Sequence, residues 1–135
     1  MKDMPMNEAL YPAVTRDLAR MRRSLAPDAS RAFHDFSNAV FADGALSPRT
    51  NHIIAVAVAH VTQCPYCIKG HTRAALNEGA SAEELMEAIW VAAEMRSGAA
   101  FAHSVIALAE IEADNAAHAN GHAANGLTAV AHHPA

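Results

Sequence analysis

Apolar residues recur at intervals of three and four along much of the chain, and this periodicity predicts helices. Residues 7–24 form the first such run, which Pro27 interrupts. A second helix is expected over residues 28–42, where Gly44 supplies a stop because glycine adopts the left-handed conformation at low cost. The positions expected to face a core in these two helices are Leu10, Val14, Leu18, Met21, Leu25, Ala32, Phe33, Phe36, Val40 and Phe41.

The third run, residues 48–62, is apolar on almost every side, which predicts a central, buried helix. Ser47 stands before it in the position of a helix cap, and Pro48 takes the first helical position. A buried strand is the alternative, because Ile and Val are β-branched, but the length, the alanines and the cap favour a helix. Pro65 has no amide hydrogen to donate, so this helix should end before it. A fourth helix should start there and run to residue 77 or 78.

A capping box opens the next expected helix, residues 81–96, with Ser81 at the cap and Glu84 three residues later. A serine–glycine pair should weaken the chain after residue 96, and a sixth helix is expected over residues 99–115. The residues expected to be buried in these two helices are Leu85, Met86, Ile89, Trp90, Ala93, Phe101, Val105, Leu108 and Ile111. Residues 115–135 are rich in His and Ala with few large apolar groups, which predicts a flexible tail.

Composition strengthens the helical interpretation. Of the 135 residues, 52% are hydrophobic, but alanine supplies much of that fraction and aromatic residues make up only 5%. Alanine is the best helix former and a poor strand former. We therefore expect an all-α helical bundle of about six helices, forming one domain over residues 1–114.

Charge and targeting features narrow the range of partners. The formal net charge is −4. The one basic concentration is typical of a solvated helix face or a subunit contact, so we expect no nucleic-acid partner; it consists of Arg16, Arg20, Arg22 and Arg23. No apolar signal segment opens the chain, and no uncharged apolar run reaches the roughly 18 residues of a membrane span. We expect a cytoplasmic protein without a membrane partner.

The candidate chemistry lies in residues 52–71, which contain the only two cysteines, Cys64 and Cys67. Cysteines three apart on a helical turn can form a disulfide. In a chain without a secretion signal, such a pair is typical of redox or metal chemistry rather than of a structural staple. The predicted helix start would favour a thiolate. His71 would lie one turn after Cys67 on the same face, where it could take up the thiol proton.

Two further histidines, His52 and His60, lie upstream on the apolar helix, and their spacing allows both to face the thiols. His60 can equally be a hydrogen-bonded structural residue. Zinc is the main chemical alternative, because Cys64, Cys67 and His71 could supply three ligands and a neighbouring histidine the fourth. Structural zinc sites commonly use a second ligand pair from further along the chain, and this sequence has no second cysteine pair. Two buried, unreactive cysteines are the remaining alternative.

A family resemblance rests on residues 47–89, which read SPRTNHIIAVAVAHVTQCPYCIKGHTRAALNEGASAEELMEAI. This run resembles the core of the carboxymuconolactone decarboxylase/alkylhydroperoxidase AhpD-like family. The shared features are Cys-x-x-Cys-x-x-x-His and a Gly-Ala-Ser-x-x-Glu turn into the next helix. The match extends over residues 47–110, about half of the chain.

The resemblance implies an all-α fold, a homo-oligomer (a trimer or hexamer) and thiol-dependent peroxidase or disulfide oxidoreductase activity. It implies that Cys67 attacks the substrate, that Cys64 resolves the product and that His71 is the base or proton relay. The substrate would be a hydroperoxide or a disulfide, and an external dithiol would act as reductant. We expect no cofactor and no metal beyond the redox-active Cys64–Cys67 disulfide.

Two positions depart from the family pattern. His52 lies twelve residues before Cys64, where the AhpD type has a glutamate of the proton relay. Tyr66 stands between the cysteines, where that type typically has a second relay histidine. Loss of the glutamate removes a negative charge that would orient His71, so we expect an altered relay that includes His52. Tyr66 and His60 are expected to support the site from outside.

An enzyme that reduces hydroperoxides is the preferred functional hypothesis. The alternative is a non-catalytic helical oligomer that acts as a redox sensor or zinc-holding scaffold, or a decarboxylase-like family member. The decarboxylase branch matches less well, because it generally lacks the redox cysteine pair. Bound zinc would favour the scaffold, whereas reversible thiol oxidation would favour the enzyme or the sensor.

Overall fold

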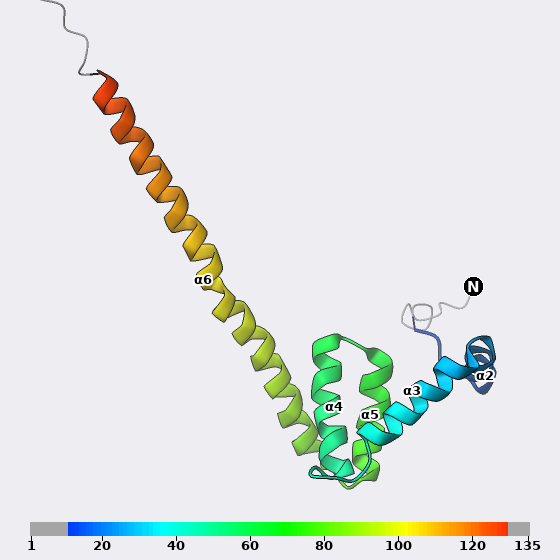
Figure 1. Ribbon diagram of the computed structural model, residues 1–135. Coiled ribbons are helices and arrows are strands. Elements are labelled where there is room, and N and C mark those ends of the chain that lie inside the picture. Colours follow the sequence, from blue (N-terminus) through cyan, green and yellow to red (C-terminus); the bar gives the residue numbers. More distant parts are fainter. Residues whose placement is uncertain (1–10, 130–135) are drawn as a thin grey trace, which may run out of the picture. The chain divides into compact units, whose positions relative to one another are not determined.

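Five α-helices make up most of the chain that the computed structural model describes, which is residues 11–129 with side chains to residue 120. They are α2 (Arg16–Leu25), α3 (Pro27–Val40), α4 (Pro48–Thr62), α5 (Pro65–Asn77) and α6 (Ala82–Ala129), shown in Figure 1. The described residues contain no strand, so the expected all-α fold is confirmed.

Two compact units divide the chain, residues 1–93 and residues 94–135. The first contains α2 to α5 and the start of α6, and it holds both cysteines. The second consists, in its described part, of the remainder of α6. The expected single domain over residues 1–114 stays a prediction.

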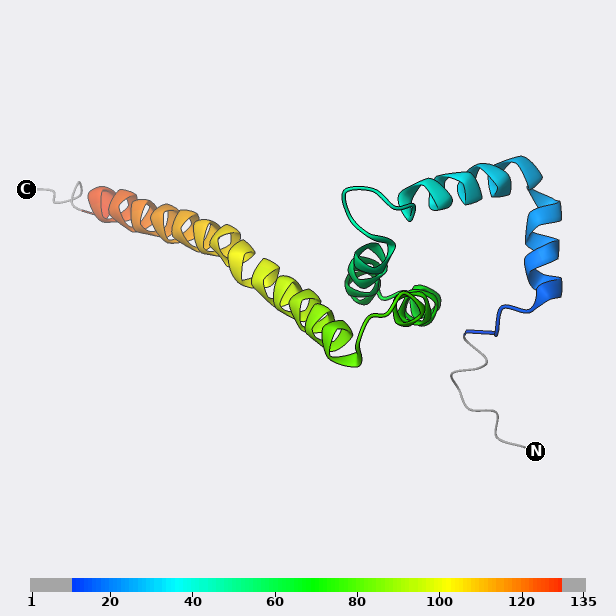
Figure 2. The ribbon, with the colours of Figure 1, turned by 90° about the horizontal axis from the view of Figure 1, so that it is seen from below.

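Helices α4 and α5 lie side by side and run in opposite directions, as Figures 1 and 2 show. Ser47 caps α4 by accepting a hydrogen bond from the Thr50 amide, and Pro48 follows at the first helical position. The helix ends where Gln63 takes a left-handed conformation with φ of 56°. This residue reverses the chain so quickly that Cys64 is already the N-cap of α5. The sequence predicted both helices and the Ser47 cap.

A small core lies where α4, α5 and the start of α6 meet. Its buried members are Val56, Ala75, Ala80 and Leu85, and Ile53 and Ile89 pack against them. Besides Val56 and Leu85, the buried members are both alanines, so the helices meet with little apolar volume between them. This core holds α4 and α5 together below the cysteine pair.

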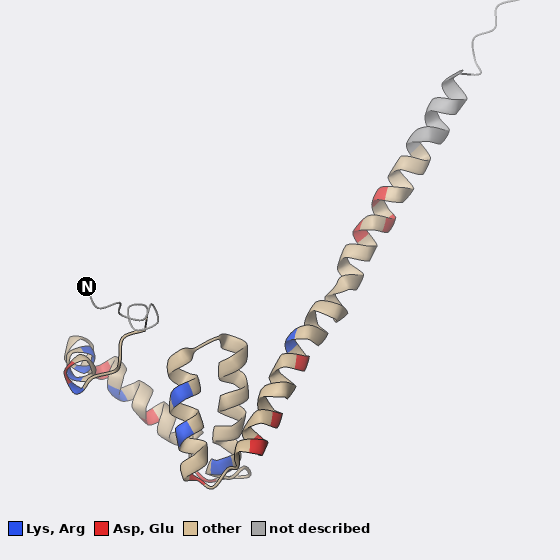
Figure 3. Cartoon of the chain, turned by 180° about the vertical axis from the view of Figure 1, so that it is seen from behind, with Lys and Arg blue, Asp and Glu red and all other residues tan. Residues whose placement is uncertain are grey.

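The start of α6 is tied to its own cap and to α4. The Ser81 hydroxyl accepts the Glu84 amide at 3.1 Å, and the Glu84 carboxylate accepts the Ser81 amide at 2.8 Å, which confirms the capping box. Glu84 also forms an ion pair with Arg49 in the first turn of α4. The hydrogen bond from the Ser81 backbone, and then that from Arg49, lower the pKa of Glu84. Figure 3 shows the acidic residues that gather at the start of α6.

The first helix begins later than the sequence pattern predicted. It starts at Arg16, where the Thr15 hydroxyl accepts the Leu18 amide, whereas the expected start was residue 7. Residues 11–15 are not helical, and residues 7–10 lie outside the described residues. The N-cap bond of Thr15 sets this boundary, because a capping side chain stabilises a helix start more than periodicity alone.

The expected break after residue 96 is wrong, because α6 passes through this region without interruption. A glycine inside a helix costs about 1 kcal/mol relative to alanine. The alanines at positions 99, 100 and 102 favour continuation of the helix around Gly98. The helix then continues to residue 129, so the described part of the expected tail is helical. A helical backbone is no measure of mobility, and the predicted flexibility stays a prediction.

Many apolar side chains that were expected to be buried are exposed in the single chain. They are Val14, Leu18, Met21, Leu25, Phe33, Phe36, Val40, Met86, Trp90, Phe101, Val105, Leu108 and Ile111. Helix α4 is also buried on one side only, since Ile54, Val58 and Val61 remain exposed. The periodic pattern marks which face of each helix is apolar, but within one chain only the faces that meet in the small core are covered.

Within the described residues, none of the helices combines the length and the sustained apolar character that a bilayer-spanning segment requires.

Candidate functional site

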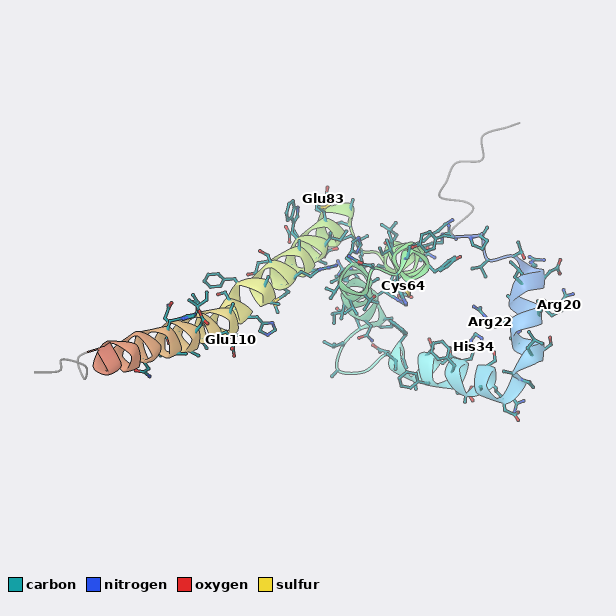
Figure 4. All side chains as sticks on the ribbon, turned by 90° about the horizontal axis from the view of Figure 1, so that it is seen from above. Arg20, Arg22, His34, Cys64, Glu83 and Glu110 are labelled. Atoms are coloured by element: carbon teal, nitrogen blue, oxygen red, sulfur yellow. A yellow bond between two sulfur atoms is a disulfide. The ribbon has the colours of Figure 1, made fainter. Side chains whose placement is uncertain are left out.

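Cys64 and Cys67 form a disulfide at the start of α5, with their Cα atoms 5.3 Å apart. Cys64 is the N-cap of this helix, and its Sγ accepts the amide of Cys67 at 3.2 Å. Figure 4 labels Cys64 in the short connection between α4 and α5. Helix N-termini favour negative charge, because their first amide groups have no partner within the helix. The geometry is compatible with the redox pair that the sequence predicted.

A cavity of about 470 Å³ lies beside the disulfide, in the first unit. Residues of α3, α4 and α5 line it, together with the C-cap of α3: Phe33, Phe36, Ser37, Val40, Phe41, His52, Tyr66, Cys67, Gly70, His71 and Ala74. Of the two cysteines, Cys67 alone belongs to this lining. The walls are mostly aromatic and aliphatic, and Lys, Arg, Asp and Glu do not occur among the lining residues.

Two histidines from different helices meet in this cavity. His52 of α4 and His71 of α5 approach with their Nδ1 atoms 3.1 Å apart, which is a hydrogen-bond distance. One of the two nitrogens must carry the hydrogen and the other must accept it. Both side chains are half-buried. The structure thus brings Cys67, His71 and His52 to one cavity, while their catalytic roles stay predictions.

Phe41, the C-cap of α3, covers both imidazoles with one ring. Its ring stacks on His52 at a centroid distance of 4.6 Å with 8° between the planes, and on His71 at 4.8 Å with 25°. The sequence pattern placed Phe41 on an apolar helix face but gave no sign of this contact. The contact depends on the path of the chain from α3 to α4, which local periodicity does not determine.

The pKa of His71 is lowered from its ordinary value. Partial burial is the main cause, because it disfavours the charged imidazolium, and the nearby charge of His52 adds to it. His71 therefore favours its neutral form, which can accept a proton at a pH where a free histidine would be partly charged.

His60 takes no part in this cavity. Its Nδ1 lies 2.7 Å from the backbone carbonyl of Val56, one turn earlier on α4, and donates a hydrogen bond to it. His60 is not among the lining residues, which favours the alternative that it is a hydrogen-bonded structural residue. The helical spacing allowed both His52 and His60 to face the thiols, and the structure brings only His52 there.

Tyr66 lines the cavity and reaches the segment before α2. Its hydroxyl donates a hydrogen bond to the Pro12 carbonyl at 2.9 Å, and its ring meets that of Tyr11 edge-on at a centroid distance of 6.1 Å. The hydroxyl is therefore engaged by the backbone.

Among the described side chains, no three His, Cys, Asp or Glu residues are arranged to hold a metal ion. The zinc hypothesis requires both cysteines as separate thiolate ligands. In the structure the two sulfurs are bonded to each other.

Comparison with known proteins gives a family match over more than half of the chain. The model of the carboxymuconolactone decarboxylase family matches residues 27–110. This range contains α3, α4 and α5 and therefore every helix that lines the cavity.

Relatives and solved structures agree with this match. A protein of Paracoccus denitrificans, described as uncharacterized protein 4 in cox locus, is 64% identical over 81 residues, which are 60% of this chain and 73% of that protein. A carboxymuconolactone decarboxylase family protein from Legionella pneumophila is 35% identical with a TM-score of 0.55, over 58% of this chain and 70% of that one. A protein from Methanobacterium thermoautotrophicum is 33% identical with a TM-score of 0.58, over 60% and 91% of the two chains.

Proposed function

The chain belongs to the carboxymuconolactone decarboxylase family, and from that premise we propose that it is a thiol-dependent peroxidase and disulfide oxidoreductase of the alkylhydroperoxidase type. One observation carries the proposal: a Cys64–Cys67 disulfide at a helix N-terminus, with Cys67 in a cavity that also contains a histidine pair. Once the disulfide is reduced, this arrangement supplies two thiols and the base His71 within about two turns at the start of α5.

Cys67 is the attacking cysteine in this proposal. It faces the cavity, whereas Cys64 is the N-cap and uses its sulfur to accept the Cys67 amide. After reduction of the disulfide, neutral His71 accepts the Cys67 proton. The resulting thiolate is stabilised by the helix N-terminus and by the imidazolium.

The reaction with a hydroperoxide then proceeds in balanced steps. The Cys67 thiolate attacks the terminal peroxide oxygen, so that an S–O bond forms and the O–O bond breaks. The alkoxide that leaves takes the proton from His71 and becomes an alcohol. Sulfur is oxidised to a sulfenic acid, and the peroxide is reduced.

Cys64 closes the cycle on the enzyme side. Its sulfur attacks the Cys67 sulfenic acid, the disulfide forms, and the hydroxyl group leaves as water with the Cys64 proton. An external dithiol reduces the disulfide by thiol–disulfide exchange. Such reductants are maintained in the cytoplasm, where we place the protein.

The cavity suits a hydroperoxide with an apolar body. Its volume of about 470 Å³ is within the range of small-ligand pockets, and its walls are mostly apolar. The polar lining includes Cys67 and the two imidazoles. An alkyl group would bury apolar surface against the walls while the peroxide lies at the thiol.

The kinetics of thiol oxidation test the proposal. Reduced protein is mixed with an alkyl hydroperoxide in a stopped-flow instrument, and loss of thiol is followed with time. Wild type should lose two thiols per chain, and the Cys64→Ser variant one, at similar initial rates. The matched Cys67→Ser variant should be at least about 100-fold slower, because its remaining cysteine is the helix cap and lies outside the cavity lining. Equal rates in the two variants would overturn the assignment of Cys67.

A further inference from the structure

The ring of Phe41, a residue outside the cysteine motif, stacks on both imidazoles of the His52–His71 pair. We propose that Phe41 is a positioning residue that holds the two imidazoles as a hydrogen-bonded pair. In this pair a single proton is shared between the two Nδ1 atoms, and Nε2 of His71 remains available to the thiol of Cys67. The proposal rests on the proposed function only for its catalytic consequence, because the pair is formed with the disulfide in place.

The stacking geometry fixes both rings at once. Phe41 lies nearly parallel to His52, at 8°, and within 25° of His71, while the two imidazoles are tilted by 32° with centroids 5.3 Å apart. An imidazole that rotated about its side chain would lose the stack on Phe41 as well as the Nδ1–Nδ1 hydrogen bond. One phenyl ring thus restricts both hydrogen-bonding partners to the paired orientation.

Phe41 is itself held in place by backbone contacts. Its amide donates to the Ser37 carbonyl at 3.1 Å, which closes the last turn of α3. The next residue, Ala42, offers its carbonyl to the side-chain amide of Asn51 at 3.5 Å. Asn51 directly precedes His52 on α4. The segment that carries Phe41 is therefore attached to α4 beside the histidine on which Phe41 stacks.

Hydrogen-bond chemistry makes the second added proton much less favourable than the first. With the pair neutral or singly charged, one Nδ1–H can donate to the other Nδ1. With both rings charged, two N–H groups and two like charges would face each other at 3.1 Å. The lowered pKa of His71, caused by burial and by His52, is consistent with this difference. A phenyl face attracts an imidazolium, so Phe41 also stabilises the single charge on either ring.

Other charged groups offer no compensation inside the cavity. The lining side chains of α3 and of its C-cap are uncharged, and the lining residue of α4 is His52. From α5 the titratable neighbours are Tyr66, whose hydroxyl donates to the Pro12 carbonyl, and Cys67, which is in the disulfide. The protonation of the pair is therefore governed by the two imidazoles and by the ring that covers them.

The catalytic consequence is a two-step proton path. Nε2 of His71 accepts the proton of the Cys67 thiol, and His71 passes its Nδ1 hydrogen to Nδ1 of His52. One S–H bond breaks, two N–H bonds form and one N–H bond breaks. The net result is a thiolate on Cys67 and a positive charge on His52. The path runs in reverse when the alkoxide leaves.

Nitrogen NMR of the oxidised protein tests the pair without any turnover. Imidazole ¹⁵N signals are followed through a pH titration in wild type, Phe41→Leu, Phe41→Tyr and Phe36→Leu. Phe36 is the matched control, because it lines the same cavity but belongs to neither imidazole stack described above. In wild type, the His52 and His71 signals should both report two separate protonation steps, as expected of coupled sites. Phe41→Leu should uncouple them, while Phe41→Tyr and Phe36→Leu should preserve the coupling.

Independent titration of His52 and His71 in wild type would overturn the proposal, and so would equal effects of Phe41→Leu and Phe36→Leu. The wild-type and Phe41→Tyr results decide the matter if Phe41→Leu does not fold. The catalytic part is read separately from the oxidation rate of reduced protein, which Phe41→Leu should lower about tenfold through misplacement of the base. An uncoupled pair with full peroxidase activity would refute the inference alone, and a coupled pair without activity would refute the proposed function alone.

Discussion

At the scale of single residues, the charge beside His71 decides when that residue can act as a base. His52 is neutral or positive, so it cannot stabilise an imidazolium as a carboxylate would. Its hydrogen bond to His71 nevertheless engages Nδ1 of His71 and leaves Nε2 of His71 for the Cys67 thiol. In the proposed mechanism, the base is therefore oriented by a second imidazole and a phenyl ring rather than by an anion.

Replacement of His52 by glutamate tests this arrangement. A carboxylate next to His71 should raise the pKa of His71, because it favours the charged imidazolium. Since the neutral form is the base, the acid side of the pH–rate profile for Cys67 oxidation should move to higher pH. Stopped-flow rates measured across the range of histidine titration will show the shift.

His60→Asn is the control for this experiment, because His60 lies on the same helix but donates to the Val56 carbonyl outside the cavity. Its pH profile should coincide with that of wild type. If His52→Glu leaves the profile in place, or if His60→Asn moves it equally, His52 does not act on the base.

At the scale of helices, capping residues set the frame that holds the cysteines. Ser47 starts α4, Cys64 starts α5 and Ser81 starts α6, each with a side chain that accepts a backbone amide. The caps at Ser47 and Ser81 and the proline after Cys64 are visible in the sequence. For this reason α4, α5 and the start of α6 could be predicted closely.

The parts that the sequence did not predict depend on contacts between distant residues. The Phe41 stack requires α3 to end beside α4, and the Tyr66 hydroxyl meets the carbonyl of Pro12 across 54 residues of chain. The break in α6 was predicted wrongly for a different reason, because a single glycine lowers helix stability without forcing the helix to end. Local patterns therefore predicted the position of the cysteines but not the residues that arrange the histidines.

Substitution of the Ser81 cap should destabilise the start of α6 and the small core that it shares with α4 and α5. Ser81→Ala removes the acceptor of the Glu84 amide and should lower the free energy of unfolding by about 1 kcal/mol. Urea denaturation measures the change. Ser104→Ala is the matched control, because that hydroxyl donates to a carbonyl of its own helix and caps nothing, so its effect should be close to zero. Equal losses in both variants would contradict the structural role of the cap.

At the scale of the whole molecule, the chain exposes more apolar surface than a stable monomer usually does. Six hydrophobic residues are buried among those described, and four of them are alanine. Large apolar side chains on α2, α3 and α6 are exposed, including Phe33, Trp90 and Phe101. Apolar helix faces that stay exposed are typical of subunit interfaces. We therefore propose that the protein is a homo-oligomer, a trimer or hexamer, whose contacts cover these faces.

Light scattering after size-exclusion chromatography tests the oligomer. Wild type should elute as a trimer or hexamer, and Trp90→Glu should shift the distribution toward smaller species, because a charge on an apolar interface is costly to bury. Glu87→Lys is the matched control on the same helix, since it changes charge at an exposed position that is already polar. A wild-type protein that is monomeric at micromolar concentration would contradict the proposed assembly.

Trapping a sulfenic acid on Cys67 tests whether this is the residue that hydroperoxides oxidise. Reduced Cys64→Ser protein, which cannot close the disulfide, is treated with one equivalent of alkyl hydroperoxide in the presence of a sulfenic-acid reagent and analysed by peptide mass spectrometry. We predict a near-stoichiometric adduct on Cys67, and little adduct on Cys64 in the reciprocal Cys67→Ser protein. Absence of the adduct from Cys67, or an equal yield on Cys64, would refute the assignment of Cys67 as the attacking cysteine.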